Sequence, residues 1–303
     1  HGWQAMSYDP KQKIVFIPIM EIAAVHKVKE TFAKTGLFKM QPGTVNTGTE
    51  FNLFQTVPDM SDGESIPPIT GELIAFDPLT GETKWSIKHE QFWNGGPLTT
   101  SGNLVFQGRG DGKFIAYQAK DGKKLWEFDA KHGISAPPIT YSLDGKQFIA
   151  LPVGWGGGAA MLGGTMAGQH GWAYGAHPRR LLVFALGGEA ELPETPGPIF
   201  AKPLDDPSFE IDTGLAEKGE DLWGRTCFWC HGPAAVASGG APDLRSSGVM
   251  FDIEALKKVV LGGQRISRGM PSYDGQLDES DVLTLQHYVR LKARNSLSKV
   301  AAN

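Results

Sequence analysis

The only two cysteines of this 303-residue chain stand in one pentapeptide, Cys227-Phe-Trp-Cys230-His231. The spacing C-x-x-C-H is the attachment signature of a c-type haem, because the two thiols can add to the two vinyl groups of the porphyrin. The adjacent imidazole of His231 then lies beneath the iron as proximal ligand. We therefore predict covalent attachment of haem at Cys227 and Cys230, and an iron bond to His231.

Three other interpretations of the pentapeptide compete with haem attachment. A thioredoxin-like redox pair needs a strand-to-helix context and no histidine after the second cysteine. A structural zinc site needs a further pair of Cys or His ligands, and the chain has no other cysteine. A chance match is expected in cysteine-rich proteins, and this chain is not one of them. Haem attachment is the favoured interpretation.

A methionine between Gly269 and Pro271 suits the second axial position of the iron. A loop of this kind presents the thioether of Met270 to the distal face of a haem. Methionine and histidine together raise the reduction potential and suit electron transfer rather than oxygen chemistry. The alternative for an isolated methionine is packing in the core. We predict that Met270 is the distal ligand.

Amphipathic helices are expected on both sides of the pentapeptide. Residues 213–226 and 281–297 carry apolar side chains three and four positions apart, and 253–261 is predicted to be a third, shorter helix. Gly219 lets the first two helices cross closely near Tyr288. Residues 208–303 therefore resemble a small all-α class I cytochrome c domain.

The first two-thirds of the chain has the composition and the internal repeat of an all-β domain. Short apolar runs alternate with turn signals over residues 1–188. Residues 71–85 align with 112–126 at a separation of about 40 residues, which is the length of a four-stranded propeller blade. The residues repeated at matching positions are Ala75 and Ala116, Gly81 and Gly122, and Trp85 and Trp126. We assign the two tryptophans to contacts between blades.

The expected number of blades is about three, at 1–88, 89–130 and 131–188, with a closing strand near 181–186. Two hairpins, at 8–18 and 141–152, are each predicted to have a second strand that ends at a proline. Propellers close with about four to eight blades, so we expect this chain to be the C-terminal part of a longer protein. The runner-up is a chain that closes its propeller through a partner.

Residues 189–207 form a proline-rich linker between the two predicted domains. Five prolines lie within it, which indicates a stiff, extended connector. The net charge of -4 and the absence of a long basic cluster give no reason to expect nucleic acid as a partner. No apolar run approaches the roughly 20 residues needed to span a bilayer.

The order of these two parts resembles the quinohaemoprotein alcohol dehydrogenases. The resemblance is carried by the Ala-x-Asp-x-x-x-Gly-x-x-x-Trp element at 75–85, Trp93-Asn94-Gly95-Gly96 and Val153-Gly154-Trp155-Gly156-Gly157. In the last third it is carried by Pro242-Asp243-Leu244-Arg245, by Gly262-Gly263 and by Gly269-Met270-Pro271. The resemblance implies three blades of an eight-bladed propeller that holds pyrroloquinoline quinone (PQQ), followed by the cytochrome c domain.

The resemblance also implies contacts to the quinone. A planar, anionic quinone requires aromatic walls and close backbone donors, which glycine permits. The candidate contacts are Trp3, Trp93, Asn94, Val153, Gly154 and Trp155. The family places an Asn-Trp pair where this chain has Gly2-Trp3, so Trp3 is carried over and the Asn contact is not. The alternative role of these tryptophans is ordinary blade packing.

The implied reaction is oxidation of an alcohol, with electrons passing from PQQ to haem c and then to an external acceptor. That acceptor would be a periplasmic cytochrome, a copper protein or a membrane quinone. No catalytic base can be identified in this chain, and the Ca²⁺ ligands of the family are expected in an N-terminal propeller portion outside it. We assign its candidate carboxylates to turns: Asp9, Asp59, Asp62, Asp77 and Asp111.

Covalent haem attachment outside the bacterial cytoplasm predicts a periplasmic location. A different functional class stays open beside the dehydrogenase. The chain could be an electron-transfer cytochrome fused to a propeller module that binds a partner and has no substrate chemistry of its own. Bound quinone would distinguish the two.

Overall fold

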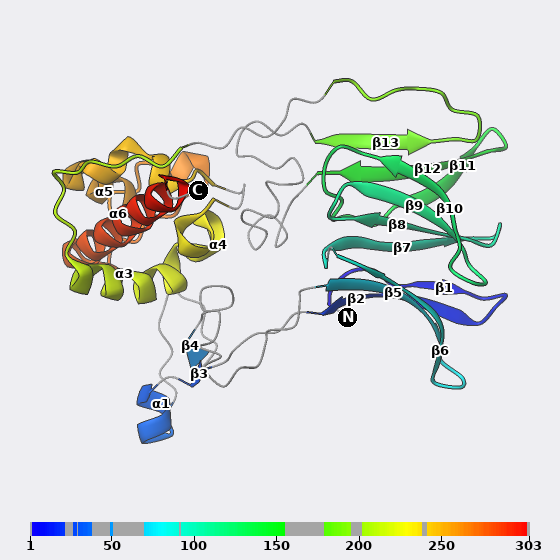
Figure 1. Cartoon of the computed structure of the whole chain (residues 1–303), viewed down its shortest axis with the longest axis horizontal. Helices are drawn as coiled ribbons and strands as arrows, with labels where there is room; N and C mark the ends of the chain where they lie inside the picture. The colour runs from blue at the N-terminus through cyan, green and yellow to red at the C-terminus, as the bar shows by residue number, and fades with distance from the viewer. Residues whose placement is uncertain are drawn as a thin grey trace. The chain divides into compact units, whose positions relative to one another are not determined.

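The computed structural model describes residues 2–21, 27–28, 30–37, 49–50, 70–90, 92–154, 179–194, 202–237 and 241–301. The chain divides into two compact units, His1–Ala23 with Met60–Ile199 and Ala24–Asp59 with Phe200–Asn303. The first unit consists of antiparallel sheets, and most of the second is helical (Figure 1). The predicted fold class, a propeller portion followed by an all-α cytochrome c domain, is confirmed.

The β unit is a succession of antiparallel meanders. The first sheet has the order β1-β2-β5-β6, and its strands are β1 (Ser7–Asp9), β2 (Ile14–Glu21), β5 (Thr70–Asp77) and β6 (Glu82–His89). The second runs β10-β9-β8-β7, with strands β7 (Asn94–Thr100), β8 (Leu104–Arg109), β9 (Lys113–Gln118) and β10 (Lys124–Asp129). Among the described residues the third holds β11 (Ile139–Leu143), β12 (Lys146–Val153) and β13 (Arg180–Phe184). Four antiparallel strands joined in sequence make one propeller blade.

Tryptophans at the repeated position join neighbouring sheets, as predicted. The indole Nε1 of Trp85 on β6 donates to the carbonyl oxygen of Ala119, beyond β9, over 2.9 Å. A Cβ at Gly122 would lie 2.9 Å from the Trp85 ring, so the repeated glycine makes room for the indole. The ring of Trp126 lies 5.5 Å from that of Phe184 on β13. Both tryptophans therefore contact the following sheet.

Two apolar clusters fill the spaces between the sheets. One combines buried residues of the first and second sheets: Ile14, Phe16, Leu73, Ala75, Val105, Ile115, Tyr117 and Ala119. The other combines the second and third sheets: Phe106, Phe114, Ala116, Ala130, Ile134, Ile149, Leu151 and Val153. Alternate residues of β8 and β9 therefore face opposite neighbours, which is why these central strands are apolar on both faces.

Two strands continue through the prolines that were predicted to end them. Pro18 lies inside β2 and Pro152 inside β12. The last β1 partner on β2 is Phe16, and the last β11 partner on β12 is Ala150. Beyond those residues each strand has only one neighbour, so the missing N–H of proline removes no donor that a second neighbour requires. The predicted closing strand near 181–186 is β13, which pairs with β12.

The helical unit contains the helices predicted around the pentapeptide. They are α3 (Thr213–Thr226), α5 (Ile253–Val260) and α6 (Glu279–Ala301), and the pentapeptide itself forms a further short helix that was not predicted, α4 (Phe228–His231). Single turns of 3-10 helix lie at Pro233–Ala235, Leu244–Ser246, Gly248–Phe251 and Ile266–Arg268. The same unit includes β3 (Lys27–Val28), α1 (Glu30–Thr35) and β4 (Thr49–Glu50). Among the described residues, no helix is both long and apolar enough to cross a membrane.

The crossing of α3 and α6 depends on a glycine. A Cβ at Gly219 would lie 2.2 Å from the carbonyl oxygen of Thr284 and 2.8 Å from the Cβ of Tyr288. Both distances are well below van der Waals contact, so no larger residue fits without moving the helices apart. The close approach near Tyr288 is therefore confirmed. It buries Trp223 and Tyr288 against each other, with ring centroids 5.4 Å apart.

Candidate haem and quinone sites

The attachment turn is the junction between α3 and α4. Cys227 is the C-cap of α3, and its N–H donates to the carbonyl of Trp223. The same residue is the N-cap of α4. The N–H of His231 donates to the carbonyl of Cys227 over 2.9 Å. Residues three and four apart lie on the same side of a helical turn, so Cys230 and His231 share a side with Cys227. Both thiols are free, and the Cys230 side chain is exposed.

The tautomer of His231 leaves one ring nitrogen for a metal. Its Nδ1 lies 2.9 Å from the carbonyl oxygen of Pro242. A carbonyl can only accept, so Nδ1 carries the proton and the lone pair belongs to Nε2. The ring is 7% exposed, and this burial lowers its pKa while the Pro242 carbonyl and the charge of Asp243 oppose the shift. A neutral imidazole with a fixed Nε2 is the form that binds iron.

Trp223 holds the turn after His231 in place. Its indole Nε1 donates to the carbonyl of Gly232 over 2.9 Å, and its ring centroid lies 6.1 Å from that of His231. The whole side chain is buried between α3 and α6. The position of the histidine is therefore determined by the packing of the two long helices.

The segment that contains Met270 is tied to the attachment turn. Gly269 has a left-handed backbone, φ 89°, and Met270 is partly buried. The Tyr273 hydroxyl donates to the carbonyl of Thr226, the residue before Cys227, over 3.0 Å. Burial, with a contribution from the neighbouring Cys227 and Cys230, raises the pKa of Tyr273 to about 12. The hydroxyl therefore stays protonated and remains a donor.

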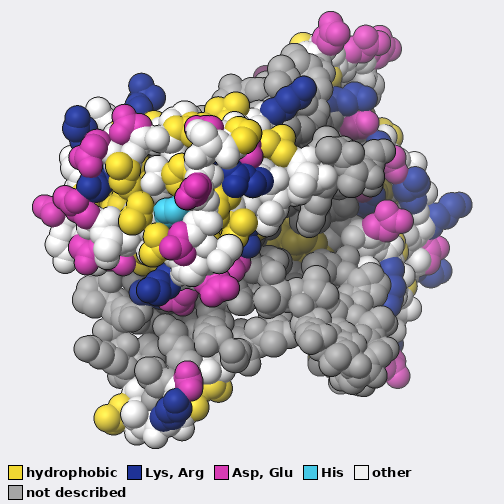
Figure 2. All heavy atoms as spheres, turned by 60° about the vertical axis from the view of Figure 1, so that its left-hand side comes forward, with side chains coloured by type: hydrophobic (Ala, Val, Ile, Leu, Met, Phe, Trp, Pro, Cys, Tyr) yellow, Lys and Arg dark blue, Asp and Glu magenta, His cyan; other side chains and the backbone are white. Residues whose placement is uncertain are grey.

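The residues of this unit fit a covalently bound haem. Burial raises the pKa of the Cys227 thiol to about 11, so the thiol is protonated at neutral pH and a thioether removes no buried charge. Figure 2 shows hydrophobic and acidic side chains interspersed on the forward face of the helical unit, and the apolar side chains of Trp223 and Phe228 are buried beside the attachment turn. Two thiols, a fixed imidazole and an apolar surround are what a c-type haem requires.

Two of the predicted quinone contacts lie together in the β unit. The ring centroids of Trp3 and Trp93 are 5.6 Å apart at 60°. Trp93 is 2% exposed, whereas Trp3, just before β1, is 61% exposed. A buried indole that supports an exposed one is suited to be one wall of a site for a planar ligand.

Glycines bring the backbones of neighbouring segments together beside these tryptophans. A Cβ at Gly95 would lie 2.2 Å from the carbonyl oxygen of Ala136, and one at Gly96 would lie 2.6 Å from that of Ala5. The N–H of Gly154 donates to the carbonyl of Gly133 over 3.0 Å. The predicted contacts on β7 and β12 thus belong to one set of closely packed segments.

The Asn94 side chain is engaged by its own strand. It is fully buried, its Oδ1 accepts from the N–H of Gly96 over 2.9 Å, and its Nδ2 donates to the carbonyl of Phe92. These bonds shape the backbone at the start of β7. Val153 is buried at the end of β12, and Trp155 lies outside the described residues.

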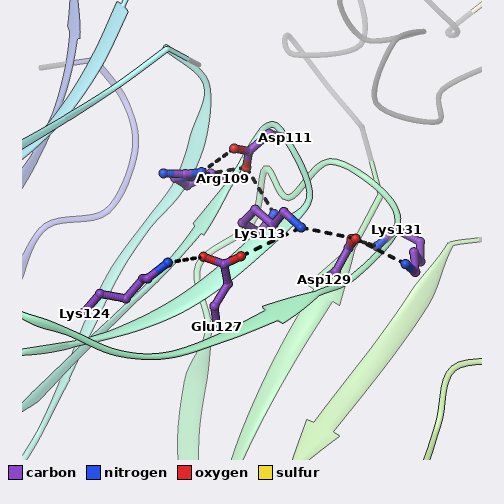
Figure 3. Close-up of polar contacts among 7 residues, drawn as sticks. All are labelled: Arg109, Asp111, Lys113, Lys124, Glu127, Asp129 and Lys131. Atoms are coloured by element: carbon purple, nitrogen blue, oxygen red, sulfur yellow. Dashed lines mark hydrogen bonds and ion pairs between the residues drawn. The ribbon is translucent and has the colours of Figure 1, made fainter.

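A group of ion pairs begins at the end of the second sheet where Asn94 on β7 pairs with Arg109 on β8, and it extends along β10 to Lys124 (Figure 3). Arg109 pairs with Asp111, Lys124 with Glu127, and Asp129 with Lys113 and Lys131. Each carboxylate in this group is held by a cation, so none is a free base.

Three of the carboxylates assigned to turns fulfil that role. Asp9, Asp77 and Asp111 each accept hydrogen bonds from backbone N–H groups two or three residues ahead. Asp59 and Asp62 lie outside the described residues. Within the described ranges, no group of three or more His, Cys, Asp or Glu side chains could hold a metal ion.

Sequence reasoning did not single out Gln4 or the role of the Pro242 carbonyl. The Gln4 side chain is buried beside Trp3, and its Nε2 donates to the sulfur of Met20 over 2.9 Å. A Cβ at Gly2 would lie 2.6 Å from the terminal methyl of Met20, a flexible group that can move aside. No local pattern marks either contact, because the partners of Gln4 and His231 are distant in sequence.

Comparison with known proteins agrees with this arrangement. Residues 1–149 match the family "Glucose/ethanol/alcohol dehydrogenase, beta-propeller domain", and residues 214–289 match "Cytochrome C oxidase, cbb3-type, subunit III". Quinohemoprotein alcohol dehydrogenase ADH IIB of Pseudomonas putida is 35% identical over 95% of this chain. The dehydrogenase subunit of the alcohol dehydrogenase (quinone) of Acetobacter aceti is 33% identical over 99% of it.

This chain corresponds to the C-terminal part of the quinohaemoprotein alcohol dehydrogenases. It spans 39% of the length of these two relatives. The structure of ADHIIG from Pseudomonas putida HK5 matches 98% of this chain with a TM-score of 0.79 and 31% identity, over 42% of that protein. The structure of the Comamonas testosteroni enzyme matches 97% with a TM-score of 0.73 and 32% identity, over 41% of that protein. PQQ and haem c are therefore the cofactors that the family implies.

Proposed function

We propose that this chain carries one wall of the quinone site and the electron exit of a PQQ-dependent alcohol dehydrogenase. The observation that supports this most strongly is the attachment turn, in which His231 presents Nε2 while Pro242 holds Nδ1. In a chain whose relatives are quinohaemoprotein dehydrogenases, that turn supports the proposal of a one-electron carrier in the same polypeptide as the propeller strands. Bound haem c would supply one-electron transfer.

The residues of each unit have separate roles in this proposal. Cys227 and Cys230 hold the haem covalently, and His231 and Met270 are its axial ligands. Trp3 and Trp93 form an aromatic wall, which orients a planar quinone by stacking and excludes water from one of its faces. Val153, Gly154 and Trp155 are proposed as further contacts, and Asn94 shapes the backbone beside them. Bound PQQ would supply the two-electron oxidation of the substrate.

The proton acceptor and the Ca²⁺ ligands are proposed to lie in other blades. Asp9 and Asp77 cap turns, and Asp111 and Asp129 pair with cations, so these carboxylates do not offer a base of the kind that alcohol oxidation requires. The substrate is proposed to be an alcohol, as the names of the relatives indicate. The electron acceptor is proposed to be a periplasmic cytochrome, a copper protein or a membrane quinone, and the location the periplasm.

A haem-free variant separates the two roles. In the holoenzyme that contains this chain, Cys227→Ser with Cys230→Ser should abolish electron transfer to the natural acceptor. It should leave PQQ-dependent reduction of an artificial dye by a primary alcohol within about twofold, because the quinone wall is in the other unit. The control is Cys230→Ser alone, which retains one thioether. Unchanged transfer to the natural acceptor in the haem-free protein would refute the proposed exit.

A further inference from the structure

The last residues of the predicted linker are bonded to the helical unit. Asp205 lies in the proline-rich stretch, and its carboxylate accepts from Arg290 Nη2 over 2.9 Å and from Arg294 Nε over 2.9 Å. Arg294 Nη2 also donates to the backbone carbonyls of Asp206 and Phe209, over 2.9 and 3.0 Å. Arg290 and Arg294, one helical turn apart on α6, therefore both bind the Asp205 carboxylate, and Arg294 also binds the backbone that follows it.

One of these arginines is a buried cation. The Arg290 side chain is 0% exposed, its Nη1 donates to the carbonyl of Leu204 over 2.8 Å, and its guanidinium lies 3.8 Å from the centre of the Phe251 ring. A buried guanidinium is tolerated only when a carboxylate and carbonyls compensate its lost hydration. Asp205 is therefore required for the packing of α6 as well as for the position of the linker.

A second set of bonds joins the linker to the proximal histidine. The N–H of Leu204 donates to the carbonyl of Arg245 over 2.9 Å. The Arg245 guanidinium forms a two-point pair with Asp243, and both side chains are largely buried. The residue before Asp243 is Pro242, whose carbonyl holds His231 Nδ1. The linker and the iron ligand are thus attached to the same turn of chain, residues 242–245.

We propose that Asp205 is a positioning residue for electron delivery. By fixing residues 204–209 to α6 and to the turn at 242–245, it makes the end of the linker a rigid part of the haem unit. The point from which the propeller is tethered is then fixed relative to the haem. A tether that is fixed close to its functional site raises the effective concentration of the joined partner. This inference rests on the proposed function.

The test compares two neighbouring carboxylates in the full-length holoenzyme. Asp205→Asn removes the negative charge and one of the two acceptor oxygens, so it weakens the bonds from both arginines. Asp206→Asn is the matched control, because it removes an equal charge one residue away while the Asp206 side chain bonds only Ser208 among the described residues. The measured quantities are the rate of haem reduction after mixing with a primary alcohol, the dye-coupled turnover and the haem midpoint potential. Amide hydrogen exchange at Leu204 reports the anchoring itself.

We expect Asp205→Asn to slow haem reduction about tenfold, with faster exchange at Leu204 and with dye turnover and midpoint potential unchanged. Asp206→Asn should match the wild type in every measurement. Equal haem reduction in the two variants would overturn the proposal, and so would a slowdown accompanied by a shifted potential, which would place the effect at the haem. A wild-type enzyme whose haem is not reduced by alcohol would instead refute the proposed function.

A second, milder variant tests the proposal in case Asp205→Asn does not fold. Arg294 is the partly exposed one of the two arginines that bind Asp205. Arg294→Lys keeps its positive charge but loses the planar guanidinium that bonds Asp205 and two backbone carbonyls at once. It should slow haem reduction in the same direction and to a smaller extent, with faster exchange at Leu204. Wild-type exchange and wild-type rate in this variant would also overturn the proposal.

Discussion

The Tyr273 hydroxyl and the Thr226 carbonyl, 47 residues apart in the chain, are joined by a 3.0 Å hydrogen bond. Thr226 precedes Cys227, the first of the two predicted attachment cysteines, and Tyr273 follows the predicted methionine ligand by three residues. The bond therefore joins the two segments of the proposed haem site, and neither of the two residues is a predicted iron ligand.

Removing this hydroxyl should loosen the methionine segment. Tyr273→Phe leaves the Thr226 carbonyl without its donor, and we expect a loss of about 1 kcal/mol in the free energy of unfolding. The fraction of ferric haem with methionine bound should also fall, measured by the weak long-wavelength band of thioether ligation. Tyr141→Phe, at an exposed position on β11, is the control and should change neither quantity. Unaltered methionine ligation in Tyr273→Phe would show that the bond does not support the site.

The identity of the distal ligand can be tested with two methionines of the same unit. Met270→His should lower the haem midpoint potential and keep the iron six-coordinate, because the thioether favours the ferrous state. Met250 is buried in the core, and Met250→Leu should leave the potential unchanged. Potentiometric titration of the holoprotein measures both. A potential that responds to Met250→Leu and not to Met270→His would reject Met270 as ligand.

The crossing of α3 and α6 should not tolerate a methyl group. Gly219→Ala places a Cβ against the backbone of Thr284 and should destabilise the helical unit by about 2 kcal/mol. At Gly248 an added Cβ meets nothing within 4 Å, so Gly248→Ala is the control and should be close to neutral. Urea unfolding followed by circular dichroism gives both values. Equal stabilities would mean that the helices separate without cost.

The bonds from Arg290 and Arg294 to Asp205 should make the free energy of unfolding of the helical unit depend on pH in the acid range. The hydrogen bond from Arg294, together with the charges of Arg294 and Arg290, holds the pKa of this carboxyl below its ordinary value of 3.8 against the opposing effect of burial. A depressed folded-state pKa stabilises the fold above about pH 4, and the contribution is lost as the pH falls through that folded value.

The stability difference between wild type and Asp205→Asn should therefore be constant from about pH 7 to 5 and shrink below about pH 4. Unfolding by urea at a series of pH values measures this difference directly. A difference that stays the same down to about pH 3 would show that the pairing of Asp205 does not contribute.

Local sequence signals predicted the elements that depend on neighbouring residues. The helix predicted at 213–226 is α3 with the same bounds, because Asp212 accepts from the N–H of Leu215 as an N-cap and the apolar face repeats regularly. The tryptophan repeat predicted the contacts between sheets for a similar reason. The tryptophan that contacts the next sheet recurs at the same position of the repeat, as Trp85 and Trp126.

The features that could not be predicted depend on partners far away in the chain. Nothing near Asp205 indicates that α6, about 85 residues later, supplies two arginines to it. Proline appeared to end β2 and β12, because the sequence does not show that the neighbouring strands β1 and β11 stop two residues earlier. The bond from Pro242 to His231 likewise requires the folded turn at 242–245.

Alcohol-driven reduction of the haem is the most direct test of the account. The holoenzyme containing this chain, loaded with PQQ and Ca²⁺ and kept anaerobic, is mixed with a primary alcohol while the haem absorbance is followed. We predict full reduction of the haem with PQQ present and none with PQQ omitted, whereas dithionite reduces it in both samples. Haem that stays oxidised after alcohol is added, in a PQQ-loaded sample that dithionite reduces, would contradict the assignment of this chain as the electron exit of a quinone-dependent dehydrogenase.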